Sequence, residues 1–236
     1  MPALFDAEEF PSLPEIGVMG SGVTVVSLCE QNTQEWFGLR FGVVTASSIA
    51  NIVTNTGQVS KGAGRSTYLG QLTGDTLLRR PQLPPGHSSM ATERGHELEP
   101  RAIEWYEKET GRAVHRVGFV FQNELRAAGC SPDGLCEDRG LEVKCPLIAG
   151  MIKHIRHITT KGTVPTEYMG QIQFSMWVTG LQLWDFILYT PEPEIPSQVV
   201  TVEADPQHQA AFNLAVPKFL DELQLSVEAI KRMISE

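Results

Sequence analysis

The sequence predicts an α+β fold in which a central mixed β-sheet is flanked by helices. Two features predict it: helix-like stretches lie near both ends of the chain, and short strand-like runs separated by turn residues lie between them. With 236 residues, 42% of them hydrophobic, the chain can bury one substantial core. We therefore expect a single domain over residues 21–236, preceded by an acidic, loosely ordered leader over residues 1–20.

Helix signals dominate the first half of the domain. Helices are expected at residues 33–40, 67–78 and 91–110. The hydroxyl residues Thr45–Ser48 suit the N-cap and first turn of another helix. Residues 54–64 and 79–89 are rich in glycine or proline and should form loops. Pro100 must start a new first turn or kink the helix that contains it, because it lacks a backbone donor.

Strand signals follow, and the clearest turn among them is Ser131–Gly134. The candidate strands are residues 117–121, 127–130, 141–145, 183–189 and 198–202. A helix is expected over residues 165–179. Asp205 and Pro206 should open a long C-terminal helix as its N-cap and first residue, with a kink near Pro217.

The distribution of charge is more informative than the net charge of −9. Taken alone, an excess of acid argues against a nucleic-acid partner, because phosphate binding depends on Lys and Arg. Residues 1–39 hold six acidic and no Lys or Arg residues, and residues 162–236 hold ten acidic and three basic ones. Residues 40–161 therefore carry 16 basic and 12 acidic residues, a balance of +4. A mixture of solvated charges is the alternative interpretation.

Neither the cysteines nor the first residues indicate secretion. The start of the chain, residues 1–9, lacks the basic and apolar regions of a signal peptide, and no run of about 18 apolar residues occurs. The cysteines form no C-x-x-C pair, and their spacing matches none of the usual iron–sulfur patterns. We expect a cytoplasmic protein whose reduced cysteines are buried: Cys29, Cys130, Cys136 and Cys145.

The densest polar signal is the turn at Asp133 followed by Glu142-Val143-Lys144. In a strand, Glu142 and Lys144 project to one side about 7 Å apart, while Val143 packs on the other. Asp133 follows the candidate strand at residues 127–130. It reaches the same place if this strand and the one at residues 141–145 pair as a hairpin. Two carboxylates and a carbonyl suit Mg²⁺ or Mn²⁺, and an adjacent lysine can orient or deprotonate an attacking water. For Glu142 and Lys144 alone, a solvated pair at a sheet edge is the alternative.

Four sequence motifs agree with one another in order along the chain. They are residues 36–47 (WFGLRFGVVTAS), 128–136 (AGCSPDGLC), 141–146 (LEVKCP) and 168–179 (YMGQIQFSMWVT). Together they closely resemble the YqaJ-like viral recombinase family, typified by phage lambda exonuclease, over about residues 34–230. The resemblance implies a restriction-endonuclease-like core. It also implies processive 5′→3′ digestion of one strand of duplex DNA from a 5′-phosphorylated end, by a ring-shaped homotrimer.

The resemblance also assigns a catalytic centre. It makes Asp133, Glu142 and the backbone carbonyl of Val143 ligands of Mg²⁺, and Lys144 the residue that activates the attacking water. Glu99 resembles the helix carboxylate that serves a second metal ion, although without the resemblance it would be a solvent-facing glutamate. Two ions, for which Mn²⁺ can substitute, would clamp the attacking and leaving oxygens.

The same resemblance places Gln171 near the scissile phosphate and makes Arg40, with the hydroxyls of Ser47 and Ser131, the anchor of the terminal 5′-phosphate. A guanidinium and hydroxyl donors suit a phosphate dianion. Each has an alternative: Gln171 on an ordinary amphipathic helix, Arg40 paired with Glu35, and Ser47 as a helix cap.

These residues predict a Mg²⁺-dependent exonuclease of phage or prophage recombination in a bacterial host. It would leave 3′ single-stranded tails for a single-strand annealing protein, through a ring with a positive lumen and a negative exterior. An endonuclease or resolvase on the same core is one alternative, and a non-catalytic protein that binds DNA ends is another. The loops and the leader do not match the family, and neither Thr92 nor Met90 is assigned as its strand-separating wedge.

Overall fold

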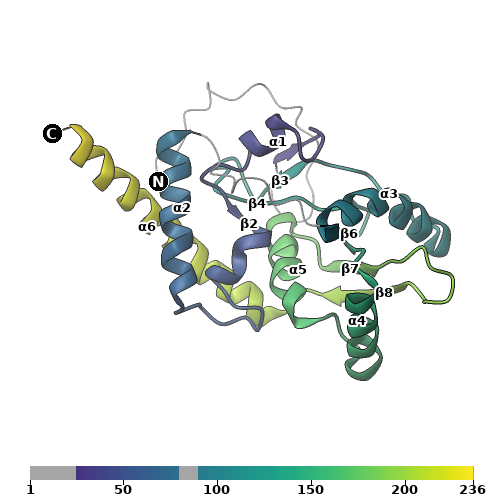
Figure 1. Cartoon of the computed structure of the whole chain (residues 1–236). Helices are drawn as coiled ribbons and strands as arrows, with labels where there is room; N and C mark the ends of the chain where they lie inside the picture. Colours follow the sequence, from purple (N-terminus) through teal and green to yellow (C-terminus); the bar gives the residue numbers. More distant parts are fainter. Residues whose placement is uncertain (1–24, 80–89, 236) are drawn as a thin grey trace.

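A computed structural model describes residues 25–79 and 90–235 (Figure 1). The expected leader, and residues 80–89 of the expected second loop, lie outside the described residues. The strands form two four-stranded sheets, each containing parallel and antiparallel pairs, with helices around them. The α+β class with mixed sheets flanked by helices is therefore confirmed, although the strands divide between two sheets.

The first sheet has the order β1-β3-β4-β2. Its strands are β1 (Val25–Ser27), β2 (Val44–Thr45), β3 (Phe119–Phe121) and β4 (Ala128–Cys130). β3 pairs antiparallel with β1 and β4, whereas β2 runs parallel to β4. This parallel pair joins residues far apart in the sequence, Val44 opposite Ala128.

The second sheet has the order β5-β6-β7-β8. Its strands are β5 (Gly134–Leu135), β6 (Arg139–Lys144), β7 (Leu183–Leu188) and β8 (Gln198–Glu203). β6 and β7 are parallel, with Glu142 opposite Phe186, and the outer strands are antiparallel to them. Only Ser131, Pro132 and Asp133 separate β4 from β5, so this short connection joins the two sheets.

The helices agree with the predicted ones except for α4, which was not expected from the sequence. They are α1 (Gln34–Gly38), the 3₁₀ helix η2 (Ala46–Asn51), α2 (Ala63–Leu78), α3 (Met90–Thr110), α4 (Ile148–Lys161), α5 (Thr166–Thr179) and α6 (Pro206–Ser235). Pro100 and Pro217 lie inside α3 and α6, which continue past them. Asp205 caps α6 as predicted, accepting from the backbone N–H of Gln207 and His208 at 3.3 Å.

Helix α5 lies at the centre of the fold. It packs against η2, α6 and strands of both sheets, and its buried side chains include Ile172, Phe174 and Met176. Because α5 is buried on most of its surface, its sequence shows little amphipathic periodicity. Its partly exposed residues Tyr168 and Gln171 face the pocket described below.

Helix α3 is attached to the second sheet by its own apolar cluster. Leu98, Ala102, Ile103 and Tyr106 pack with Leu141 and Val143 of β6 and Ile187 of β7. Among the described residues, no helix is both long enough and apolar enough to cross a membrane. All four cysteines are free thiols. Three are buried as predicted, and Cys29 is partly exposed.

Candidate active site

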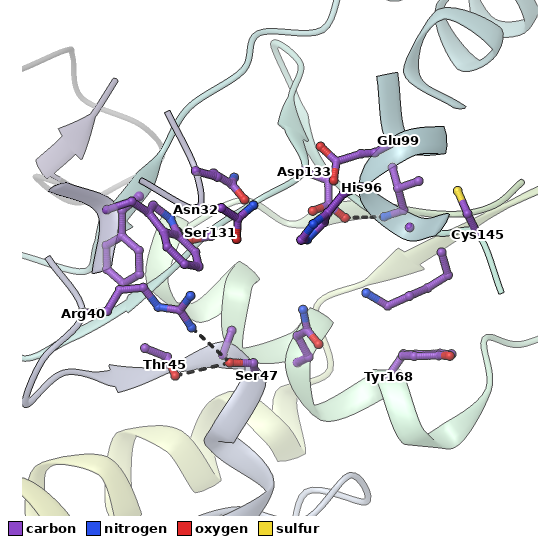
Figure 2. Close-up of a pocket in the computed structure, with 18 of the residues that line it drawn as sticks. Asn32, Arg40, Thr45, Ser47, His96, Glu99, Ser131, Asp133, Cys145 and Tyr168 are labelled. Atoms are coloured by element: carbon purple, nitrogen blue, oxygen red, sulfur yellow. Dashed lines mark hydrogen bonds between the residues drawn. The ribbon is translucent and has the colours of Figure 1, made fainter. Parts of the chain in front are cut away.

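A pocket of about 470 Å³ opens where the two sheets, α3 and α5 meet. Figure 2 shows Arg40, Ser47 and Ser131 on one side of it and Glu99, Asp133 and Tyr168 on the other, with His96 between them. The predicted site residues that line the pocket are Arg40, Ser47, Glu99, Ser131, Asp133, Val143, Lys144 and Gln171. Glu142 lies just behind this lining and is only 2% exposed.

The carboxylate–lysine pair lies on β6 as predicted. Glu142 and Lys144 project to the same side of the strand and form an ion pair, while Val143 is buried with the α3 cluster. Gln171 of α5 donates its side-chain N–H groups to both carboxylate oxygens of Glu142, each at 2.8 Å. Glu142 is therefore a buried carboxylate with both oxygens hydrogen-bonded. This argues against the alternative of a solvated pair at a sheet edge. The amide of Gln171 points into the site rather than into solvent.

Asp133 joins this cluster, but not through the predicted hairpin of residues 127–130 with residues 141–145. β4 and β6 lie in different sheets, and the two-residue strand β5, directly after Asp133, pairs with β6 instead. Its side-chain Oδ2 accepts a hydrogen bond from the backbone N–H of Val143 at 2.6 Å. Burial and the negative charge of Glu142 raise the pKa of Asp133 to about 8. Burial alone would lower the pKa of the Lys144 ammonium. The negative charges of Glu142 and Asp133 outweigh this effect and raise the pKa instead.

The backbone carbonyl of Val143 points toward the same place. In a strand, the N–H and C=O of one residue face the same edge. The N–H of Val143 faces Asp133, whereas the carbonyl of the next residue, Lys144, faces β7 and accepts from Tyr189 at 3.0 Å. β5 pairs only with Gly140 and Leu141, so the Val143 carbonyl lies beyond its end. Two carboxylates and this carbonyl form a donor set that fits a small divalent cation.

Glu99 lines the pocket from α3, but its carboxylate forms an ion pair with Arg116. Among the described residues, no three His, Cys, Asp or Glu side chains lie close enough together to hold a metal ion. The donor set therefore depends on the backbone carbonyl. His96, one helical turn before Glu99, also lines the pocket and was not singled out from the sequence. The i, i+3 spacing was the signal that could have found it.

Arg40, Ser47 and Ser131 lie together at the other end of the pocket (Figure 2). The guanidinium of Arg40 donates to Ser47 Oγ at 3.5 Å, and burial lowers the pKa of Arg40. In the described part of the chain, Arg40 makes no ion pair with Glu35. No side chain caps η2, so the capping expected of Thr45–Ser48 is wrong; the Ser47 hydroxyl faces Arg40 and Thr45 instead.

Three further residues that sequence reasoning did not assign support these groups. Trp36 donates its indole N–H to Ser131 Oγ at 2.9 Å. Gln31 donates to the carbonyl of Pro132 at 3.0 Å, which fixes the connection between the sheets. The ring of Tyr168 lies 5.5 Å from the Lys144 ammonium. Trp36 and Tyr168 both lie inside the four motifs given above. Their place in these motifs was the sequence signal that could have identified them as site residues.

The pocket therefore has two chemically different ends on two different sheets. The carboxylate and lysine end is built mainly on β6, and the arginine and hydroxyl end lies beside β2 and β4. Ser131 and Asp133, two residues apart, belong to opposite ends. Such a pocket can hold two anionic groups at once, one beside a carboxylate cluster of a kind that suits a divalent cation and one beside a guanidinium.

Comparison with known proteins gives one family. The model of the YqaJ-like viral recombinase domain matches residues 35–182. The crystal structure of LHK-Exo, an alkaline exonuclease from Laribacter hongkongensis, has 33% sequence identity and a TM-score of 0.74, and covers 86% of this chain and 98% of that one. A second structure shows LHK-Exo in complex with dAMP, at 34% identity and the same TM-score.

Two further matches cover less of the chain or are less similar to it. The ExoD protein of Escherichia coli K12 is 30% identical over 74 residues, which are 31% of this chain and 85% of ExoD. A phage-related exonuclease from Haemophilus somnus 129PT has 14% identity and a TM-score of 0.54, covering 81% of this chain and 96% of that one. This last similarity bears on the fold alone.

Proposed function

We propose that this chain, which belongs to the YqaJ-like viral recombinase domain family, is a Mg²⁺-dependent exonuclease that digests one strand of duplex DNA 5′→3′ from a 5′-phosphorylated end. The family and its exonuclease relatives support a nuclease role in recombination. The observation that carries the finer proposal is the two-ended pocket, in which a carboxylate–lysine cluster and an arginine–hydroxyl cluster share one cavity of about 470 Å³.

The first end has the groups that phosphodiester hydrolysis needs. Asp133, Glu142 and the carbonyl of Val143 would hold Mg²⁺, and Glu99 would serve a second ion once it leaves Arg116. Bound Mg²⁺ would supply Lewis-acid stabilisation of the charge that develops on the phosphate oxygens. Lys144 orients the attacking water and offsets that charge from the protein side. Gln171 fixes the orientation of Glu142 through its two hydrogen bonds.

The second end explains why the cut would occur next to a chain terminus. Arg40 with Ser47 and Ser131 provides positive charge and hydroxyl donors for a phosphate dianion. An enzyme that cuts inside a strand has no use for a terminal-phosphate site beside its catalytic groups. A deoxynucleoside monophosphate is the product class expected here, and dAMP, which LHK-Exo binds, belongs to that class.

The experiment uses linear duplex DNA with a 5′-phosphate or a 5′-hydroxyl end, labelled at either terminus. We expect release of mononucleotides from the 5′ end in Mg²⁺, faster from the phosphorylated substrate and abolished by a chelator. Lys144→Ala should lower the rate about 100- to 1,000-fold. The control Lys218→Ala, on the exposed face of α6, should retain activity. No release by wild type in Mg²⁺, or equal release by Lys144→Ala, would contradict the proposal, and cutting of closed circles would indicate an endonuclease.

We propose the assembly from the distribution of charge along the chain. A ring of three chains with residues 40–161 toward the lumen would present the segment of balance +4 to the DNA and keep the acidic ends outside. Three chains of 26.0 kDa would give a mass of about 78 kDa. Light scattering tests the trimer, and a mapped surface with acidic lumen walls would contradict this arrangement. The 3′ tails would pass to a single-strand annealing protein.

A further inference from the structure

Trp36 is buried beneath the arginine and hydroxyl end of the pocket. It lies in α1, is 6% exposed, and belongs to a small apolar cluster with Leu39, Val43, Phe119 and Phe121. The hydroxyl of Thr33 caps α1 by accepting from the backbone N–H of Trp36. Both the backbone and the ring of Trp36 are therefore held in place before any ligand binds.

Two residues of the proposed phosphate site contact this one side chain. The indole N–H is shared between Ser131 Oγ at 2.9 Å and the carbonyl of Gly118 at 3.0 Å. The guanidinium of Arg40 lies over the face of the same indole, 4.0 Å from its centroid. Arg40 is 4 residues from Trp36 in the sequence and Ser131 is 95 away, so the indole links two distant segments.

The indole determines what Ser131 and Arg40 can offer a ligand. A serine hydroxyl has one donor hydrogen and two acceptor lone pairs. Because the indole N–H can only donate, Ser131 must accept from it, and the Ser131 hydrogen is left to donate to an anion. A guanidinium stacked on an aromatic face keeps its N–H groups in its own plane, directed outward. Stacking also holds Arg40 in the pocket without a carboxylate that would compete with phosphate.

We infer that Trp36 is a positioning residue that orients Arg40 and Ser131 together for recognition of a terminal 5′-phosphate. The inference rests on the proposed function, because it concerns the same site. Trp36 does not touch the phosphate itself. It acts through the two residues that do, and preference for a phosphorylated end depends on both of its contacts.

Substitution of Trp36 by phenylalanine or leucine separates its contact with Ser131 from its contact with Arg40. Trp36→Phe keeps an aromatic face under Arg40 but removes the donor to Ser131, whereas Trp36→Leu removes both. The readout is the ratio of kcat/KM on 5′-phosphorylated ends to that on 5′-hydroxyl ends. A merely structural role would lower both rates together and leave this ratio unchanged.

We expect Trp36→Phe to lower the ratio about 2- to 10-fold, as loss of one neutral hydrogen bond implies. Ser131→Ala should lower it at least as much, because it also removes the hydroxyl that donates to the phosphate, and the double variant should be no worse than Ser131→Ala alone, because the bond from the indole is already lost. Trp36→Leu should lower it further, toward the value of Arg40→Ala. Trp177→Phe is the matched control, because it removes an indole hydrogen bond to Asn213 away from the pocket and should leave the ratio unchanged.

Folding is checked by circular dichroism and thermal melting. If Trp36→Phe does not fold, replacing Trp36 with benzothienylalanine keeps the bicyclic shape and removes only the N–H donor. A ratio equal to wild type in the folded phenylalanine or benzothienyl variant would overturn the inference, as would additive losses in the double variant. A wild-type protein without any preference for 5′-phosphate would instead overturn the proposed function of the arginine and hydroxyl end.

Discussion

Asp185 on β7 is a buried carboxylate that holds three strands of the second sheet and α3 together. Its oxygens accept from Arg139 of β6 at 3.1 and 3.2 Å, from the Tyr106 hydroxyl of α3 at 2.6 Å and from the Thr201 hydroxyl of β8 at 2.6 Å. We predict that Asp185→Ala strongly destabilises the fold. The same guanidinium also binds Asp138, which is exposed and provides a matched comparison.

The size of the effect follows from burial. The side chains of Asp185 and Arg139 are 3% and 11% exposed, so removal of the aspartate leaves two hydroxyls without their acceptor and the buried guanidinium with Asp138 as its remaining carboxylate. Breaking such a buried pair costs about 3 to 5 kcal/mol. For a domain whose total stability is on the order of 5–15 kcal/mol, this is a large share. The side chain of Asp138 is 46% exposed, and water can replace it, so Asp138→Ala should change stability far less.

Urea unfolding followed by circular dichroism measures both variants, at one fixed protein concentration because association would add to the apparent stability. The expected result is a large fall in the free energy of unfolding for Asp185→Ala and a small one for Asp138→Ala. Equal losses in the two variants, or a loss below about 1 kcal/mol for Asp185→Ala, would show that burial does not govern the strength of this network.

Three further predictions concern packing and the pocket. Gly140→Ala should lower the free energy of unfolding by about 1–3 kcal/mol, because the added Cβ would lie 2.3 to 2.6 Å from ring atoms of the buried Trp184; Gly70→Ala on α2, where nothing lies within 4 Å, should not destabilise the fold. Arg40→Ala should reduce the kcat/KM ratio of 5′-phosphorylated to 5′-hydroxyl ends about 10-fold or more, and an unchanged ratio would remove Arg40 from the anchor. Gln171→Ala should lower nuclease activity about 10- to 100-fold, measured over a Mg²⁺ titration, because a buried carboxylate loses both N–H donors that orient it.

The sequence predicted most of the elements because their signals are local. The Asp205–Pro206 start of α6 is an example in which capping chemistry acts within a few residues. The turn expected at Ser131–Gly134 is instead a short connection with a bend at Asp133, and Gly134 belongs to β5. Helix α4 carried a similar signal, with isoleucines at positions 148, 152, 155 and 158 near helical spacing. However, Gly150 and the β-branched side chains lower its helix propensity, so the signal for a helix in this segment is weak.

The division into two sheets could not be predicted, because it depends on pairing between distant segments. β1 and β2 have three and two residues, too few to show a period, and each pairs with a strand more than 80 residues away. The same limit applies to the pocket. The motifs indicated Glu142, Lys144 and Arg40, but the bond between Trp36 and Ser131 spans 95 residues and has no local signature.

The connection between β4 and β5, residues Ser131, Pro132 and Asp133, would set a fixed distance between the two ends of the pocket. Ser131 and Asp133 are two residues apart, so their backbones lie at most about 7 Å from each other, and the proline between them fixes one backbone torsion. Gln31 fixes the middle of the connection through the carbonyl of Pro132. On the proposed function, one end holds the terminal phosphate and the other lies beside the next phosphate of the same strand. The release of one nucleotide per cut would then be encoded in the length of this connection, and one inserted residue would move the position of the cut relative to the strand end.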